Sequence, residues 1–291
     1  MQLRPRSLTL LATACAATVL ACGAPVVQPL DEAKRPEPPR KDSKDKDSKA
    51  ATPADVTPTP APATPAEPYA RAGDPKSQRD ELRFWGFSPD GTRYAFETYY
   101  HGPGATTCEG EASLFIVDAT RDAFLEGSPL VLKHKQPDAE RCDPPDLRAE
   151  MDRHREQLLH RHEIVVGNQG PAIVPAPAID EQGKARASTI ALPSGTSLRA
   201  EVVVTGGDRE KVGERGAAYK LTLVREGQPP KVVEPGTRRR PFVWDYNLDD
   251  GAVFVGPDGR HLAIVLGTAQ RSFEGDRHGY MSNGVQLPDG W

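Results

Sequence analysis

The histidines are the first residues of this chain that could do metal chemistry, because His154, His160 and His162 lie close together. A helix turns about 100° per residue, so His154 and His160 would point to nearly opposite sides. Residues two apart do not face each other either, and no His-Glu-x-x-His pattern is present. We therefore expect a solvated, charged helix here and no metal ligands. Further candidates could join a site only through the fold: His134, His261, His278 and Asp276.

A candidate nucleophile is Ser282, because the segment Gly279-Tyr-Met-Ser-Asn-Gly284 is one residue off the Gly-x-Ser-x-Gly elbow. That elbow needs a strand-to-helix turn around the serine, and the flanking sequence does not predict one. We interpret Ser282-Asn283-Gly284 as a hairpin turn instead. The chain also has no Walker loop and no dinucleotide fingerprint. We therefore predict no catalytic residues and no cofactor.

Arg238, Arg239 and Arg240 form a local basic segment beside Phe242 and Trp244. Such a segment could stack on a ligand or bind an anion. A solvated sheet edge is the alternative interpretation, since charges protect edges from pairing. The formal net charge of −4 opposes a nucleic-acid partner.

Residues 1–21 have the pattern of a signal peptide. Arg4 and Arg6 precede an uncharged run that is too short to span a membrane. The run ends in Val-Leu-Ala-Cys22-Gly, which resembles the lipobox of bacterial lipoproteins, where cleavage leaves a diacylated cysteine as the first residue. The resemblance implies an exported protein that Cys22 anchors to a bacterial membrane, facing the periplasm or the outer surface. The alternatives are plain secretion with cleavage near Ala24 and a cytoplasmic protein with an apolar N-terminus.

Two further cysteines, Cys108 and Cys142, would lie in the exported part of the chain, where disulfides persist. A bridge between them would join the loop after the first hairpin to the start of the helix. Closing that loop is worth about 4 kcal/mol in the chain-entropy model. We expect this disulfide. Free thiols or a redox role are the alternatives, although the chain lacks a Cys-x-x-Cys spacing.

Residues 22–74 differ in composition from the rest of the chain. Prolines recur every few residues, Lys and Asp interleave from Arg40 to Lys49, and Thr-Pro-Ala units follow. Such a segment has too little apolar surface to offset its ordering entropy, so we expect a disordered linker. Its extended reach, on the order of 100 Å or more, suits a tether. Residues 75–291 are enough for a single domain with a real core.

Two Pro-Asp-Gly turns organise the expected domain. Pro89-Asp90-Gly91 lies between apolar runs in residues 84–100, and Pro257-Asp258-Gly259 lies in residues 255–264, which repeat the same pattern. Proline presets φ, aspartate bonds the turn backbone, and glycine takes a positive φ. Each pattern therefore predicts a β-hairpin whose turn is structural rather than functional.

One amphipathic helix is expected over about residues 144–163, with Leu147, Met151 and Leu158 on its apolar stripe. The other periodic segments alternate as strands do. We therefore predict a mainly β domain of antiparallel sheets, sandwich-like or resembling propeller blades. A Tol-B-type propeller is not predicted, because the two Pro-Asp-Gly copies lie 168 residues apart with no third between them.

The segments that open and close the domain together resemble one known family. They are Gly86-Phe-Ser-Pro-Asp-Gly91, Leu114-Phe-Ile-Val-Asp118 and Phe273-Glu-Gly-Asp-Arg277. The family is bacterial and is described only as predicted secreted proteins of unknown function. The resemblance covers about residues 84–276, and Thr98 departs from it where an acidic residue is usual. It implies export and a mostly β domain, and it carries over no catalytic residues.

The last of these segments, Phe273, Glu274, Gly275, Asp276 and Arg277, is our candidate functional loop. Its glycine and charges predict a loop after a strand, and loops on rigid scaffolds are where function concentrates. In the alternative, Phe273 fills the core, and Glu274 or Asp276 pairs with Arg277 or a strand-borne arginine.

We expect a non-catalytic binding or scaffolding module, with the membrane and an envelope protein or polymer as partners. The alternative is a hydrolase or metal-dependent enzyme acting on envelope polymers. Three or more His, Asp or Glu side chains converging in a pocket would favour the enzyme. An exposed aromatic patch without titratable groups would favour the binding module.

Overall fold

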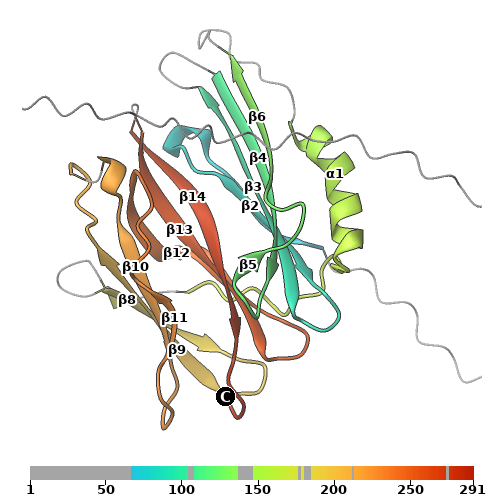
Figure 1. Ribbon diagram of the computed structural model, residues 1–291, viewed down its shortest axis with the longest axis vertical. Helices are drawn as coiled ribbons and strands as arrows, with labels where there is room; N and C mark the ends of the chain where they lie inside the picture. Colours follow the sequence, from blue (N-terminus) through green and yellow to red (C-terminus); the bar gives the residue numbers. More distant parts are fainter. Residues whose placement is uncertain are drawn as a thin grey trace, which may run out of the picture. The chain divides into compact units, whose positions relative to one another are not determined.

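Alternating apolar residues form three antiparallel sheets in the computed structural model (Figure 1). The structure describes residues 67–103, 108–136, 147–175, 178–179, 185–211, 213–272 and 275–291, all within one compact unit, Ala61–Trp291. The expected signal peptide, Cys22, and the linker up to residue 66 lie outside the described residues, as does Cys142.

The N-terminal sheet has six strands, in the order β1-β2-β3-β4-β5 with β6 also paired to β4. They are β1 (Tyr69–Arg71), β2 (Glu81–Phe87), β3 (Arg93–Pro103), β4 (Cys108–Asp118), β5 (Ala123–Phe124) and β6 (Leu130–Gln136).

The central sheet has the order β12-β13-β14, and the five-stranded sheet has the order β11-β10-β9-β8-β7. The central strands are β12 (Val243–Val255), β13 (His261–Ser272) and β14 (Gly275–Gln286). The others are β7 (Ala178–Ile179), β8 (Ala185–Ala191), β9 (Ser197–Thr205), β10 (Ala218–Val224) and β11 (Lys231–Pro235). The predicted mainly β class with antiparallel sheets is therefore confirmed.

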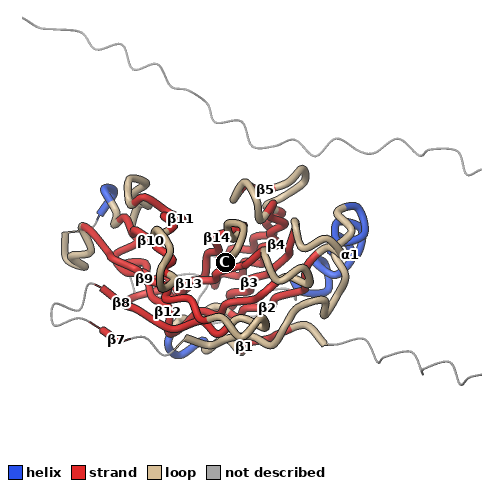
Figure 2. Tube along the Cα trace, turned by 90° about the horizontal axis from the view of Figure 1, so that it is seen from below, coloured by secondary structure: helices blue, strands red, loops and turns tan. Residues whose placement is uncertain are grey.

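Both faces of the central sheet are buried. Its strands contain runs of consecutive apolar residues, which place apolar side chains on each face. Side chains alternate between the faces of a strand. In β12, Val253 and Val255 pack into a core with the five-stranded sheet, whereas Ala252 and Phe254 pack into a second core with the N-terminal sheet. The three sheets therefore form three layers, with the central sheet in the middle (Figures 1 and 2).

A single α-helix among the described residues, α1 (Leu147–Arg161), covers the outer face of the N-terminal sheet (Figure 1). Leu147, Met151 and Leu158 are buried there, which confirms the predicted apolar stripe. The helix ends two residues earlier than predicted, and the described helices include none that is both long and apolar enough to cross a membrane.

The two Pro-Asp-Gly turns close hairpins of different sheets, β2–β3 and β12–β13, and they lie against each other. Gly91 and Gly259 have φ values of 74° and 69°, so the predicted positive φ is confirmed at both. A Cβ on Gly91 would come within 2.7 Å of Asp258 Oδ1. The repeated turns therefore form one contact between two layers.

Two local predictions for β14 are wrong. Ser282-Asn283-Gly284 is not a hairpin turn, and the stretch Gly275–Arg277 is not part of a loop, because β14 pairs with β13 from Gly275 to Gln286 without a register shift. The glycines that suggested a turn allow close packing instead. A Cβ on Gly284 would lie 2.7 Å from the Cα of Ala119.

Candidate functional site

The candidate site is a cavity of about 410 Å³ beside β14, where the central sheet ends. Its size falls within the usual range for ligand pockets, about 300–1,000 Å³. In Figure 2, β11 and β5 extend past β14 on either side of it. The lining residues are Phe96, Phe115, Val117, Asp122, Ala123, Phe124, Glu234, Arg238, Arg240, Tyr280, Met281, Ser282 and Asn283. Three layers therefore meet at this cavity, each supplying a different kind of surface.

The free edge of β14 forms the floor, and neighbouring segments cover that edge at two places. The amide of Gly284 donates to Asp122 Oδ1 over 2.6 Å. The amide of His278 donates to the carbonyl of Gln78 over 2.9 Å. Both amides therefore point away from β13.

Between these two points the edge is open. Outward-pointing groups belong to alternate residues in an antiparallel ladder, and this ladder is unbroken. Tyr280 and Ser282 must therefore direct their N–H and C=O groups away from β13 as well. Those groups form no hydrogen bonds with other described residues. The floor of the cavity thus presents two unpaired backbone donors and two acceptors.

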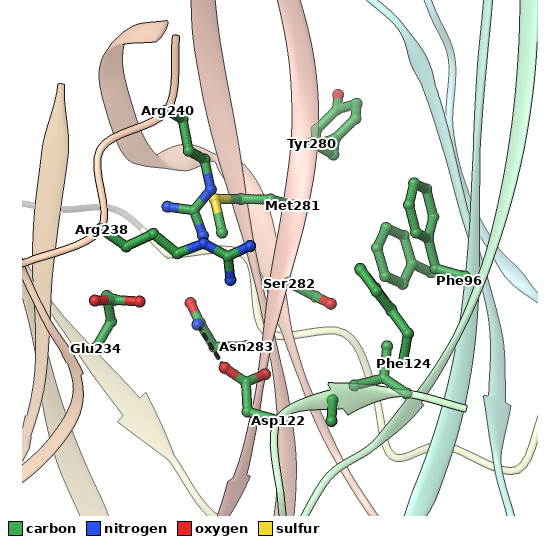
Figure 3. A pocket seen from close by; sticks show the side chains of 13 residues that line it. Phe96, Asp122, Phe124, Glu234, Arg238, Arg240, Tyr280, Met281, Ser282 and Asn283 are labelled. Carbon is green, nitrogen blue, oxygen red and sulfur yellow. Dashed lines mark hydrogen bonds between the residues drawn. The ribbon is translucent and has the colours of Figure 1, made fainter. Parts of the chain in front are cut away.

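One wall is aromatic and comes from the N-terminal sheet. The rings of Phe96 and Phe115 stack with centroids 4.6 Å apart, and Phe124 lies 5.7 Å from Phe115. Phe124 is 56% exposed, although phenylalanine side chains are usually buried. Figure 3 shows Phe96 and Phe124 on the side of β14 opposite the arginines. This wall can contact an apolar or planar group.

The other wall is basic and follows β11 of the five-stranded sheet. Neither Arg238 nor Arg240 forms an ion pair with another described residue. The Arg240 guanidinium lies over the rings of Tyr219 and Tyr246, at 5.3 and 5.8 Å, and its buried Nη1 has no hydrogen-bond partner among the described residues. Glu234 is the carboxylate on this wall, and its Oε1 accepts from a backbone amide. The basic wall therefore keeps donors for an anionic group.

Hydrogen bonds hold the lower end of the cavity in place. Asn283 Nδ2 donates to Asp122 Oδ2 (Figure 3). The hydroxyl of Tyr219 donates to Asn283 Oδ1 over 2.7 Å. Burial raises the pKa of Tyr219, so this hydroxyl stays protonated and keeps donating. Asp122 has a φ of 50°, a left-handed conformation that aspartate tolerates. The polar groups at this end are therefore used within the protein.

The candidate loop of the sequence analysis lies at the start of β14. Phe273 and Glu274 are outside the described residues. Asp276 accepts two hydrogen bonds from Arg209, and Arg277 donates two to Asp80, each over 3.1 Å. Burial raises the pKa of Asp80, and the Arg277 guanidinium opposes that rise. The Arg277 pair ties the segment before β2 to β14, and the Asp276 pair ties the segment after β9 to it.

The remaining candidates are separate from the cavity. Asp90 and Asp258 accept hydrogen bonds from their own turn backbones, and Asp258 also contacts His261 Nδ1 at 2.6 Å. The side chain of Cys108 and all of Cys142 are outside the described residues, so the disulfide stays a prediction. Among the side chains that the structure describes, no three His, Cys, Asp or Glu residues are grouped to hold a metal.

The family assignment rests on residues 95–285, which match the family described as Predicted secreted protein (DUF2259). The chain belongs to this family. Every residue that lines the cavity lies inside the matched range. Searches of curated proteins and of solved structures found no match. The family's description carries export and no activity, so the function must be argued from the site.

Some of these residues are candidates in the sequence, but the sequence does not predict that they line one cavity. The sequence indicates a candidate anion site at Arg238 and Arg240, and it predicts Ser282 as part of a turn. Phe96 and Phe115 lie in segments that predict strands, and Phe124 lies between the predicted strands. Phe124 had one usable clue, since it follows Thr120-Arg-Asp-Ala in a polar segment where a large apolar residue has no core to fill.

Proposed function

We propose that this chain is a lipid-anchored protein of the cell envelope whose β domain is a non-catalytic binding module. Its membership in a family of predicted secreted proteins supports export. The signal-peptide pattern and the lipobox-like Cys22 support an anchor, and the linker supports a domain held away from the membrane.

The observation that carries the binding role is the composition of the cavity beside β14. It places exposed aromatic surface, two guanidinium groups that form no ion pair with another described residue, and two backbone donors without a described partner around one hollow. Proteins seldom leave such groups unused together, because each loses favourable contacts. A ligand with an apolar part and an anionic part satisfies both walls.

The enzyme alternative has little support from this geometry. Ser282 lines the cavity, but its Oγ accepts a hydrogen bond from the hydroxyl of Tyr94 over 2.9 Å. Burial raises the pKa of Tyr94 well above its usual value, so this partner cannot serve as a base. A serine nucleophile needs a neighbouring base to remove its proton.

Membrane fractionation tests the anchor. We expect wild-type protein with an added lipid mass in the membrane fraction and Cys22→Ser in the soluble exported fraction, because a diacylated cysteine with an added amide-linked chain holds far better than a single acyl group. A Cys22→Ser variant that stays in the membrane fraction, with no lipid mass on wild type, contradicts the anchor.

Photo-crosslinking in whole cells tests the binding site. A photoreactive phenylalanine replaces Phe124 in one strain and Val174 in another, because the two side chains are 56% and 55% exposed and only Phe124 lines the cavity. We expect a defined adduct at position 124 that Arg238→Gln abolishes and Arg239→Gln leaves in place. Arg239 is the matched control, since it carries the same charge next to Arg238 but does not line the cavity.

Equal adducts at both positions, or an adduct that persists in Arg238→Gln, would contradict a ligand site beside β14.

A further inference from the structure

The cavity occupies the position that a fourth strand of the central sheet would take. Among the residues that the structure describes, the central sheet stops after three strands, whereas its neighbours have six and five. Both neighbours continue past β14 and supply the two walls. Because stacked sheets lie about 10 Å apart, the space beyond β14 is one layer thick. It therefore has the thickness that an extended chain needs.

The open part of the β14 edge has a defined length. Gln78 covers the edge at His278, and Asp122 covers it at Gly284. The outward-facing backbone groups of Tyr280 and Ser282 lie between these two positions and are open. Strand residues rise about 3.3 Å each, so about 20 Å separates the two covered positions. A short extended segment can pair with both open residues and form four backbone hydrogen bonds.

We infer that the cavity binds an extended peptide of a partner protein, which adds to β14 as a fourth antiparallel or parallel strand. The inference rests on the proposed binding function and specifies its ligand. Main-chain hydrogen bonds to Tyr280 and Ser282 supply affinity, and the walls select side chains, as in other cases of strand addition.

The two walls set the sequence of that peptide. Successive side chains of an added strand point to opposite faces. One set faces Arg238 and Arg240, which have no ion-pair partners among the described residues, and the other set faces Phe96, Phe115 and Phe124. Glu234 removes part of the positive charge of the basic wall but leaves an excess on that wall, and the Asp122 carboxylate at the lower end accepts hydrogen bonds from Asn283 and the Gly284 amide. The peptide that fits therefore alternates acidic with aromatic or aliphatic residues.

The chain's own N-terminal segment fits this description poorly. Residues 1–66 contain no Phe, Tyr or Trp, and their prolines remove backbone donors. A partner segment is therefore the better occupant.

The probe is a capped seven-residue peptide of alternating Phe and Glu, titrated into full-length protein in detergent and followed by fluorescence anisotropy. We expect saturable binding, weakened about tenfold by Lys in place of Glu, and weakened about fivefold by Arg238→Gln but not by Arg239→Gln. A seven-residue peptide with the same composition, in which all Phe residues precede all Glu residues, controls for composition and charge, and it should bind at least tenfold more weakly.

Backbone N-methylation tests the strand pairing itself. In an added strand, the amides that face β14 all belong to residues on one wall. Two probes, one methylated at every Phe amide and one at every Glu amide, should therefore differ in their affinity for the protein. One should bind at least tenfold more weakly, since each lost hydrogen bond is worth about fivefold, and the other should stay within about twofold of the parent peptide.

Matched variants at Ser282 give the same test from the protein side. Ser282→Pro removes the outward N–H, and proline is tolerated at an edge position whose N–H does not pair within the sheet. Ser282→Ala keeps the N–H and loses only the Oγ contact with Tyr94. We expect Ser282→Pro to bind at least fivefold more weakly than Ser282→Ala, since the two variants both lack the Oγ and differ in the N–H.

Amide hydrogen exchange on the wild-type protein tests the strand pairing even if Ser282→Pro does not fold. The Tyr280 and Ser282 amides should exchange quickly in free protein and at least tenfold more slowly with peptide. Slow exchange without peptide would mean that another segment of this chain already covers the edge, and it would overturn the inference.

The outcomes separate the inference from the proposed function. Equal weakening by both methylations, or by neither, overturns strand addition even where the peptide binds. No peptide binding, together with a specific adduct at position 124, overturns the peptide ligand and leaves the binding module. Failure of both experiments overturns the binding module as well.

Discussion

Replacing Arg277 should show how much its buried ion pair with Asp80, at the start of β14, contributes to the stability of the fold. The Asp80 side chain is 5% exposed and that of Arg277 is 26% exposed, and two hydrogen bonds of 3.1 Å join them. The Arg277 guanidinium also lies 4.4 Å from the ring of Tyr100 and 3.5 Å from Glu111. Arg277→Met keeps the apolar stem and removes the charge.

The expected loss of stability follows from this geometry. Two unit charges 3.1 Å apart interact by about 5 kcal/mol at an effective dielectric constant of about 20. Part of this is regained, because the variant no longer desolvates the guanidinium and Asp80 can take up a proton or water. We therefore expect the free energy of unfolding to fall by about 3 kcal/mol near neutral pH, at the lower end for a broken buried pair.

The loss should depend on pH with a fixed sign. Burial already raises the pKa of Asp80, and removing Arg277 takes away the group that opposes this rise. A carboxyl whose folded pKa is raised stabilises the fold below its unfolded pKa, and that contribution disappears as pH rises through the folded pKa. The deficit of Arg277→Met should therefore be largest at pH 8 and shrink to about half by pH 5.

Urea unfolding of the wild type and the variants at pH 5 and pH 8 measures the free energy of unfolding and so the deficit of Arg277→Met. Asp80→Asn combined with Arg277→Met should recover most of the stability, because no charge is left buried alone. Lys211→Met is the control, since its pair with Asp208 has a lysine side chain that is 83% exposed, and its stability should be unchanged. A deficit that is equal at pH 5 and pH 8, or that the double variant does not reduce, refutes the reasoning.

The remaining predictions concern the turns and the cysteines. Gly91→Val should destabilise by about 3 kcal/mol and Gly259→Val by about 1 kcal/mol in thermal unfolding, because both strain a positive φ but only a side chain at Gly91 meets Asp258; equal losses would contradict the turn contact. Cys108 and Cys142 should appear as one disulfide-linked pair in non-reducing peptide mapping, and reduction should cost a few kcal/mol at most; two alkylatable thiols in the exported protein would contradict the bridge.

The strands and turns with local signals could be predicted from the sequence. Pro89-Asp90-Gly91 and Pro257-Asp258-Gly259 encode their own turns, and Leu147, Met151 and Leu158 encode the buried stripe of α1. Residues 252–255 show that a strand is buried on both faces, because four apolar residues are consecutive. These features depend on neighbours in the chain.

Strand β14 and the cavity depend on distant residues, so the sequence could not show them. Gly279, Asn283 and Gly284 have low strand propensity, yet they are held by pairing with β13 and by contacts to Asp80, Asp122 and Ala119. The aromatic and basic walls lie more than 100 residues apart in the chain. Only the stacking of three sheets brings them to one place.

The Asp80–Arg277 pair and the free edge belong to one arrangement along β14. The pair fastens the segment that covers the edge at His278, and Asp122 covers it at Gly284, so both ends of the open stretch are fixed. Proteins usually protect an open edge over its whole length, because unpaired edges promote aggregation. Here the protection stops for two residues, at the point where arginines and exposed aromatic rings stand on either side. A packing defect would not need fixed ends or complementary walls, and this combination is why we assign the gap to a partner strand.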